Sequence, residues 1–272
     1  MLTKVLTTVL VLLTLTACGS EPVAPALPAE RLALPFDRYR PGFAEETEIV
    51  RARATLVRAC LHDRGVELAV PEDDHTPGVL DLSPNLRRYG VIDEATATNF
   101  GYHFPKTAEE RQQQLEQRRW AAGLTETQRT TLFGERGCTE QAETELTKVD
   151  DGFLTDADFR SLRTSETDPR VGAALAAWRA CMTGRGYGYA DPRAAISDPR
   201  WNLDAELIPH DEKDTALADV RCKATAHLVE VWHDVEAAAQ EQEIRHDAAQ
   251  FDRLAAAWQA RLAVTRRVLG SS

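Results

Sequence analysis

Apolar residues recur at helical spacing in two well-separated stretches of the chain. The first stretch begins at Glu45 and ends at Gly65, with Pro71 following shortly after. Its apolar residues share one face of a helix: Ile49, Leu56, Val57, Cys60 and Leu61. The second stretch opens with Asp168 as an N-cap and Pro169 in the first turn, and it ends at Gly184 and Gly186. Its stripe consists of Val171, Ala174, Leu175, Trp178, Cys181 and Met182. Each cysteine therefore lies on the buried face near the end of its helix.

The remaining pattern is also helical, so we predict a mainly α fold. Short helices are expected over 91–97, over 138–149 and after Thr155, and the capping-box patterns that begin at Thr107 and Thr125 open two more. Beyond Pro209 the chain holds no proline, and no glycine until Gly270. There a heptad stripe steps through Ile244, Ala248, Phe251, Ala255, Trp258 and Leu262. The polar start of this region predicts either a bend or one long helix.

A short sequence motif, called the repeated phrase below, occurs twice in the chain, each time around a cysteine. Residues 58–65 read RACLHDRG and residues 179–186 read RACMTGRG. Each copy is followed by a second cysteine on an expected helix, Cys138 in the first case and Cys222 in the second, with alanine four residues later. We therefore predict two units, each made of a helix with a cysteine, a glycine stop, an excursion and a second helix with a cysteine.

Four cysteines remain after Cys18, and in an exported protein they allow three disulfide pairings. If the two units are duplicates, each closes its own bridge, which pairs Cys60 with Cys138 and Cys181 with Cys222. A metal site is not expected, because no two of these four cysteines lie within forty residues of one another, whereas zinc sites use close pairs.

The second unit resembles a family of uncharacterised actinobacterial lipoproteins. The resemblance lies in Trp178 to Met182, in the Gly-Tyr-Gly-Tyr run at 186–189 and in Ala218 to Lys223. In that family a W-x-x-C-M-x-x-x-G-Y segment precedes a D-V-x-C-K helix. The first copy departs from the pattern, because Val57 stands where Trp178 does and Val66 stands for Tyr187. The resemblance implies secretion or lipid anchoring, and it implies no activity.

The N-terminus has the features of an export signal. Residues 1–17 hold one lysine and an apolar run that is too short to span a bilayer, and the run closes on Leu-Thr-Ala before Cys18. This ending resembles the lipobox of bacterial lipoproteins, which implies that Cys18 receives diacylglycerol and becomes the new N-terminus. Ordinary secretion with a chance cysteine is the alternative. No other segment approaches the length of a membrane span.

These features divide the chain into a signal peptide (1–17), a lipidated, proline-rich tether (18–44), a first helical unit (45–150) and a second unit (151–272) that includes the C-terminal helix or helix pair. Residues 19–41 are expected not to fold, and when extended they would reach roughly 70 Å from the membrane. The full chain has a net charge of −11, and removing the signal peptide with its single charge, Lys4, leaves −12. This acidity argues against nucleic acid as a partner.

No motif in the sequence indicates catalysis, so no catalytic, cofactor or metal residues are predicted. His103 in the run GYHFP lacks a partner that sequence could place beside it, and the tyrosines of 184–192 are interpreted as core residues more readily than as the lining of a carbohydrate or peptide groove. The acidic runs at 71–75 and 149–158 do not match the spacing of calcium loops, and they are expected to be solvated loops.

We therefore expect a lipid-anchored protein on the outer face of the cytoplasmic membrane that binds, scaffolds or senses without catalysis, with the membrane and an envelope protein as partners. A hydrolase of cell-wall material and a solute-binding component of a transporter are the alternatives. The candidate partner-contact surface is the C-terminal stripe of Phe251, Leu254, Trp258 and Leu262. Packing of this stripe on the protein's own first helix is the competing interpretation.

Overall fold

The computed structural model describes residues 32–71, 85–106, 108–205 and 207–270, and Cys18 with the predicted signal peptide lies outside these ranges. The described residues form helices and connecting segments without a strand, so the predicted mainly α fold is confirmed. The elements are η2 (Pro35–Tyr39), α1 (Phe43–Asp63), α3 (Glu94–Phe100), α4 (Ala108–Gly123), α5 (Glu126–Phe133), α6 (Cys138–Glu145), α7 (Gly152–Glu166), α8 (Pro169–Gly184), α9 (Pro192–Ile196), α10 (His210–Thr225), α11 (Leu228–His246) and α12 (Ala248–Gly270).

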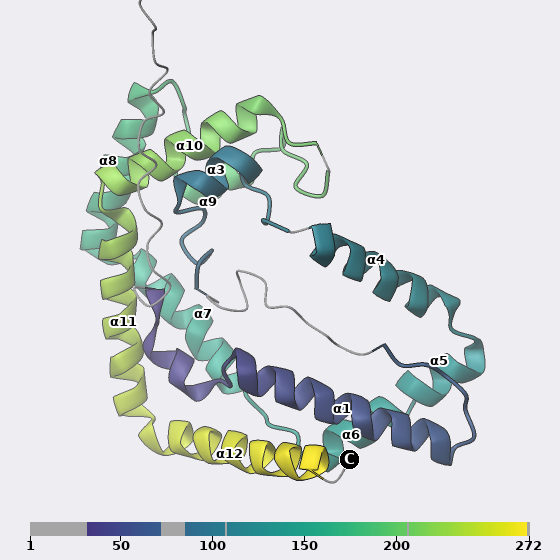
Figure 1. Ribbon diagram of the computed structural model, residues 1–272. Coiled ribbons are helices and arrows are strands. Elements are labelled where there is room, and N and C mark those ends of the chain that lie inside the picture. The colour runs from purple at the N-terminus through teal and green to yellow at the C-terminus, as the bar shows by residue number, and fades with distance from the viewer. Residues whose placement is uncertain (1–31, 72–84, 107, 206, 271–272) are drawn as a thin grey trace, which may run out of the picture.

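Both predicted disulfides are present, and each joins two helices that pack together. Cys60 of α1 is bonded to Cys138 of α6, with the two Cα atoms 5.6 Å apart. Cys181 of α8 is bonded to Cys222 of α10, with a Cα separation of 5.5 Å. Figure 1 places the α1–α6 pair at the lower edge of the molecule and the α8–α10 pair at the upper edge, so the two stapled units form opposite ends of the fold.

The repeated phrase encodes the same helix ending in both copies. The amide of Val66 donates to the Leu61 carbonyl, and the amide of Tyr187 donates to the Met182 carbonyl, each over 2.9 Å. In both copies the preceding glycine has a positive φ, as a Schellman C-cap requires. Val66 and Tyr187 each pack against the core of their unit, which completes the hydrophobic contact of this motif.

The second helices of the two units differ, however, in where the disulfide holds them. Cys138 is the first residue of α6, whereas Cys222 lies in the last turn of α10. The two units are therefore alike in the first helix and its glycine stop. They differ in the second helix, which is bonded at its start in the first unit and near its end in the second.

Two long helices connect the ends of the molecule. α11 packs along α7 and α8, and after Asp247 the chain turns into α12, which packs along α1 (Figure 1). The sequence left open a bend or one continuous helix, and the structure has the bend. At this corner Phe36, Leu154, Ile244 and Phe251 form a core cluster with their neighbours on η2, α7 and α12.

The C-terminal stripe is part of this interior, so its interpretation as an exposed partner-contact surface is wrong. Phe251, Leu254 and Leu262 are 1%, 3% and 1% exposed, and Trp258 is half-buried against the same cluster. The physical reason is that α12 lies along α1, whose own apolar face needs a partner. α12 does pack along the first helix, as the competing interpretation expected, but Phe251 packs on Phe36 of η2 and on Phe153 of α7.

The tether prediction is wrong from residue 32 onward. Leu32, Leu34 and Phe36 are buried, and residues 35–39 form a 3-10 helix. The side-chain oxygen of Gln240 accepts the Phe36 amide at 3.0 Å, and the Phe36 ring stacks on Phe251 with centroids 5.3 Å apart. These partners lie more than 200 residues away along the chain, so the local sequence carries no sign of them.

The smaller helices follow their sequence signals with shifted limits. The capping box at Thr125 is present, with the Gln128 amide donating to the Thr125 hydroxyl at 3.2 Å, whereas Thr107 lies outside the described residues. α6 ends at Glu145 instead of 149, because Thr147 adopts a left-handed φ of 63°. α4 has no buried residue, which is typical of a polar helix that bridges two parts of a fold.

Candidate functional site

A surface hollow of about 410 Å³ lies next to the second copy of the repeated phrase. It is formed where the segment after α8, the segment after α9 and the first turns of α10 meet. We call it the tyrosine hollow. Its lining residues are Gly186, Tyr187, Gly188, Tyr189, Asp198, Arg200, Asp211, Asp214 and Thr215. The volume falls within the range of small-molecule sites in proteins.

The helix ending of α8 places the two tyrosines. Tyr187 is the residue that follows the glycine of the Schellman cap, and its ring packs against the core of the second unit. Tyr189, two residues further on, packs between this core and the neighbouring cluster around Trp201. Both rings are half-buried. The sequence interpretation of these tyrosines as packing residues is therefore correct, and they also line the hollow.

One wall of the hollow is a closed set of polar bonds around Asp198. The Tyr189 hydroxyl donates to the Asp198 carboxylate at 2.7 Å, and the Arg200 guanidinium donates to the same carboxylate at 2.8 Å. Arg200 also donates to the Tyr189 oxygen at 2.7 Å. The bonds from Arg200 hold the pKa of the Asp198 carboxyl below its usual range, and burial together with Asp198 raises the pKa of the Tyr189 hydroxyl.

The opposite wall is the start of α10. Asp211 and Asp214 are exposed and one helical turn apart, so their carboxylates lie on one side of the helix. Thr215 between them and the core is buried, and its hydroxyl donates to the Asp211 carbonyl at 2.6 Å. Acidic side chains are favoured at the start of a helix because the exposed backbone amides there carry partial positive charge.

His103 lies outside the hollow, and each of its ring nitrogens has a hydrogen-bond partner within the fold. Its Nδ1 lies 2.9 Å from the buried Glu212 carboxylate, and its Nε2 lies 3.1 Å from the Asn202 carbonyl oxygen. Each ring nitrogen of His103 therefore lies within hydrogen-bond distance of an oxygen atom of the fold. The Tyr102 amide donates to the same oxygen of Glu212 at 2.9 Å. His103 therefore has no free nitrogen to act as a general base, and the packing interpretation of the GYHFP run holds for Tyr102 and His103.

A second buried pair fixes α10 to its neighbours. The Lys223 ammonium donates to the Asp219 carboxylate and to the Val91 carbonyl, each at 2.9 Å, and the Trp178 indole donates to Asp219 at 2.9 Å. Burial raises the pKa of the Asp219 carboxyl and lowers the pKa of the Lys223 ammonium, while each charge favours the ionised form of the other. The charges satisfy each other inside the fold, which is a structural role.

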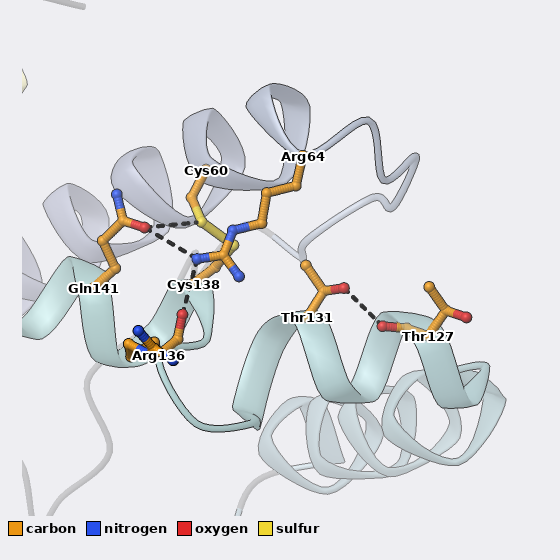
Figure 2. The surroundings of a disulfide bond; sticks show 7 residues. All are labelled: Cys60, Arg64, Thr127, Thr131, Arg136, Cys138 and Gln141. Atoms are coloured by element: carbon orange, nitrogen blue, oxygen red, sulfur yellow. Dashed lines mark hydrogen bonds between the residues drawn. A yellow bond between two sulfur atoms is a disulfide. The ribbon is translucent and has the colours of Figure 1, made fainter.

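The disulfide of the first unit is surrounded by side chains that tie the ends of α1 and α6 together (Figure 2). Arg64 donates to the Arg136 carbonyl at 2.8 Å and to the Gln141 side chain at 3.3 Å. Cys138 is fully buried and Cys60 is 6% exposed. These contacts fit a structural bridge that holds two helices in place.

The acidic run at 149–158 differs from its prediction as a solvated loop. Residues 152–158 form the first two turns of α7 and bury Leu154 and Ala157, whereas 72–75 lie outside the described residues. Among the residues that the structure describes, no group of three potential metal ligands comes together. No helix of the described ranges is long and apolar enough to cross a membrane.

Sequence reasoning missed the charged residues of the hollow. Asp198, Arg200, Asp211 and Asp214 come from two segments that approach each other only when α10 folds against α8. The one local signal was the Asp-Pro-Arg run at 198–200, in which the carboxylate also accepts the Arg200 amide at 2.9 Å. Comparisons of the chain with protein-family models, with curated proteins and with solved structures find no match.

Proposed function

We propose that this chain is a lipid-anchored lipoprotein of the outer face of the cytoplasmic membrane, held through Cys18, and that it acts by binding and not by catalysis. The membrane anchor and a ligand or protein of the cell envelope are its partners in this proposal. The lipobox at Cys18 supplies the anchor, and a single cleaved signal peptide supplies the export route.

The observation that carries the proposal is the pair of long-range disulfides. Each bridge closes a long loop, 78 residues in one case and 41 in the other, and each lies in the interior of its own unit. Structural disulfides of this kind form and persist in oxidising compartments outside the cytoplasm. They therefore support export, which the signal peptide requires.

The binding role is supported by how the polar groups are distributed. The buried charged and imidazole groups His103, Glu236, Asp219 and Lys223 are all engaged with other parts of the fold. The tyrosine hollow, by contrast, presents aromatic and carboxylate groups to solvent. A surface of this kind is suited to holding a ligand or a segment of a partner.

The docked segment limits how far the body stands from the membrane. Fourteen residue steps separate Cys18 from Leu32, the first described residue, which is buried. At ~3.6 Å per step the body can stand at most about 50 Å from its anchor. A partner in the envelope is therefore expected close to the membrane surface.

Membrane fractionation of cells that express the wild-type chain and the Cys18→Ser variant tests the proposal. The wild-type chain should partition into the detergent phase, and Cys18→Ser should be released in soluble form. Ser20→Ala is the matched control, because it changes a neighbouring residue and leaves both Cys18 and the disulfides in place. Recovery of Cys18→Ser in the detergent phase, or of wild type in the soluble fraction, would refute the anchoring.

A further inference from the structure

The tyrosine hollow carries an excess of negative charge that the fold leaves uncompensated. Its lining holds three carboxylates and one guanidinium, which gives a formal charge of −2. The single cation, Arg200, is committed to Asp198 and stacks 4.6 Å above the centre of the Trp201 ring. Within the described parts of the chain, neither Asp211 nor Asp214 has a lysine, arginine or histidine within ion-pair distance.

Aromatic surface lies beside these carboxylates. Tyr187 and Tyr189 both line the hollow, and both residues are half-buried. A tyrosine face attracts a cation through its negative π surface. The glycines on either side of Tyr187 add no obstruction, because a Cβ atom built on Gly186 or Gly188 would meet nothing within 4 Å.

We propose that the tyrosine hollow binds a guanidinium group of a ligand, with Asp211 and Asp214 as the charge partners and the tyrosine rings as the stacking surface. A planar guanidinium both pairs with carboxylates and stacks on aromatic rings, whereas an ammonium group offers only a point charge. The hollow is larger than one guanidinium, so the group that carries it has room to enter as well. This inference rests on the proposed binding function and names the chemistry of its ligand.

The competing explanation is that Asp211 and Asp214 merely compensate the partial positive charge at the start of α10. That role needs no ligand and no tyrosine nearby. The two explanations differ in whether a guanidinium compound binds at the hollow, and in whether the binding depends on these two carboxylates in particular or on the acidity of the whole protein.

The experiment is an NMR titration of the mature full-length chain, released by Cys18→Ser, with N-acetyl-L-arginine amide. The probe should shift the amide signals of Gly186 and Gly188 in a saturable way. N-acetyl-L-citrulline amide, which has nearly the same shape without the charge, should leave both signals in place. The double variant Asp211→Asn/Asp214→Asn should weaken binding of the arginine probe about tenfold, the effect of removing two exposed charge pairs.

The double variant Asp156→Asn/Asp252→Asn is the matched control, because both residues are exposed on other helices and the change in net charge is the same. It should bind the arginine probe as the parent chain does. Equal binding of the citrulline probe, an equal loss in both double variants, or no shift of Gly186 and Gly188 would each overturn the proposal. Membrane release of Cys18→Ser is measured separately, so failure of the hollow is distinguishable from failure of the anchoring proposal.

Discussion

Removing the two disulfides one at a time should affect different parts of the molecule. The chain-entropy relation for the unfolded state gives ~4.5 kcal/mol for the 78-residue loop closed by Cys60 and Cys138, as an upper value. The same relation gives ~3.9 kcal/mol for the 41-residue loop closed by Cys181 and Cys222. The two bridges thus raise the free energy of the unfolded state by similar amounts.

The packing around each bridge in the folded state, however, makes the effects of losing them unequal. The core around Cys60 and Cys138 is small, and the two cysteines are among its seven buried members. α6 packs mainly on α1 and α5, and α4 adds only the half-buried Trp120 to this core. In contrast, α10 is held by α3, α8, α9 and α11, and the core around its cysteine includes Trp178, Met182 and Trp232.

We therefore expect Cys60→Ala/Cys138→Ala to open the first unit locally, with faster amide hydrogen exchange in α5, α6 and the end of α1. Exchange in α8 and α10 should stay close to that of wild type. Cys181→Ala/Cys222→Ala should lower the free energy of unfolding of the whole molecule, by up to ~4 kcal/mol, without a region that opens alone. The measurements are hydrogen exchange followed by mass spectrometry, and denaturant unfolding of both variants.

Two results would refute this reasoning. One is unchanged exchange in α5 and α6 in the first variant together with a loss of less than about 1 kcal/mol, because the bridge would then hold nothing that the packing does not. The other is selective opening of α8 and α10 in the first variant, because the two units would then not be separate structural bodies.

Three further predictions concern the helix ending, the C-terminal stripe and the buried Tyr102. Gly186→Ala should cost about 1–2 kcal/mol because its φ is +91°, whereas Gly188→Ala, two residues on and without that constraint, should change the unfolding free energy by less than ~0.5 kcal/mol. Leu262→Ala should cost about 2–5 kcal/mol and lower Tm clearly, whereas Leu203→Ala, which is 42% exposed, should change Tm little; an unchanged Tm for Leu262→Ala would show that the stripe is not core. Burial raises the pKa of the Tyr102 hydroxyl above its unfolded value near 10, so the stability that the neutral hydroxyl contributes is complete below pH 10 and is lost as the pH rises. Tyr102→Phe should therefore reduce the fall in unfolding free energy above pH 10 by about 1.4 kcal/mol per pH unit. Equal slopes in both proteins would contradict this.

The features that the sequence predicted correctly are those that neighbouring residues determine. The apolar faces of α1 and α8, their glycine stops and the N-cap of α8 by Asp168 depend on spacings of three or four residues, and these spacings are visible in the chain. The disulfide pairing followed from the order of two like phrases, and both bridges are as predicted.

The features that failed depend on distant partners. Phe36 is buried because Gln240 and Phe251 lie against it, so a proline-rich stretch that looks like a tether is in fact docked. The apolar stripe of α12 could be recognised in the sequence, but the elements that pack on it could not. Periodicity identifies an apolar face and does not identify what covers it. The tyrosine hollow needs Asp198 and Asp214 from two segments that only the folded chain brings together.

The most direct test of the account is mass mapping, without reduction, of the protein isolated from its native membrane. The expected result is an N-terminal peptide that begins at Cys18 and carries a diacylglyceryl group, together with linked peptides for Cys60–Cys138 and Cys181–Cys222. An unmodified Cys18 inside a longer N-terminal peptide, or free thiols at the other four cysteines, would contradict the claim that this chain is an exported, lipid-anchored and disulfide-closed binding protein.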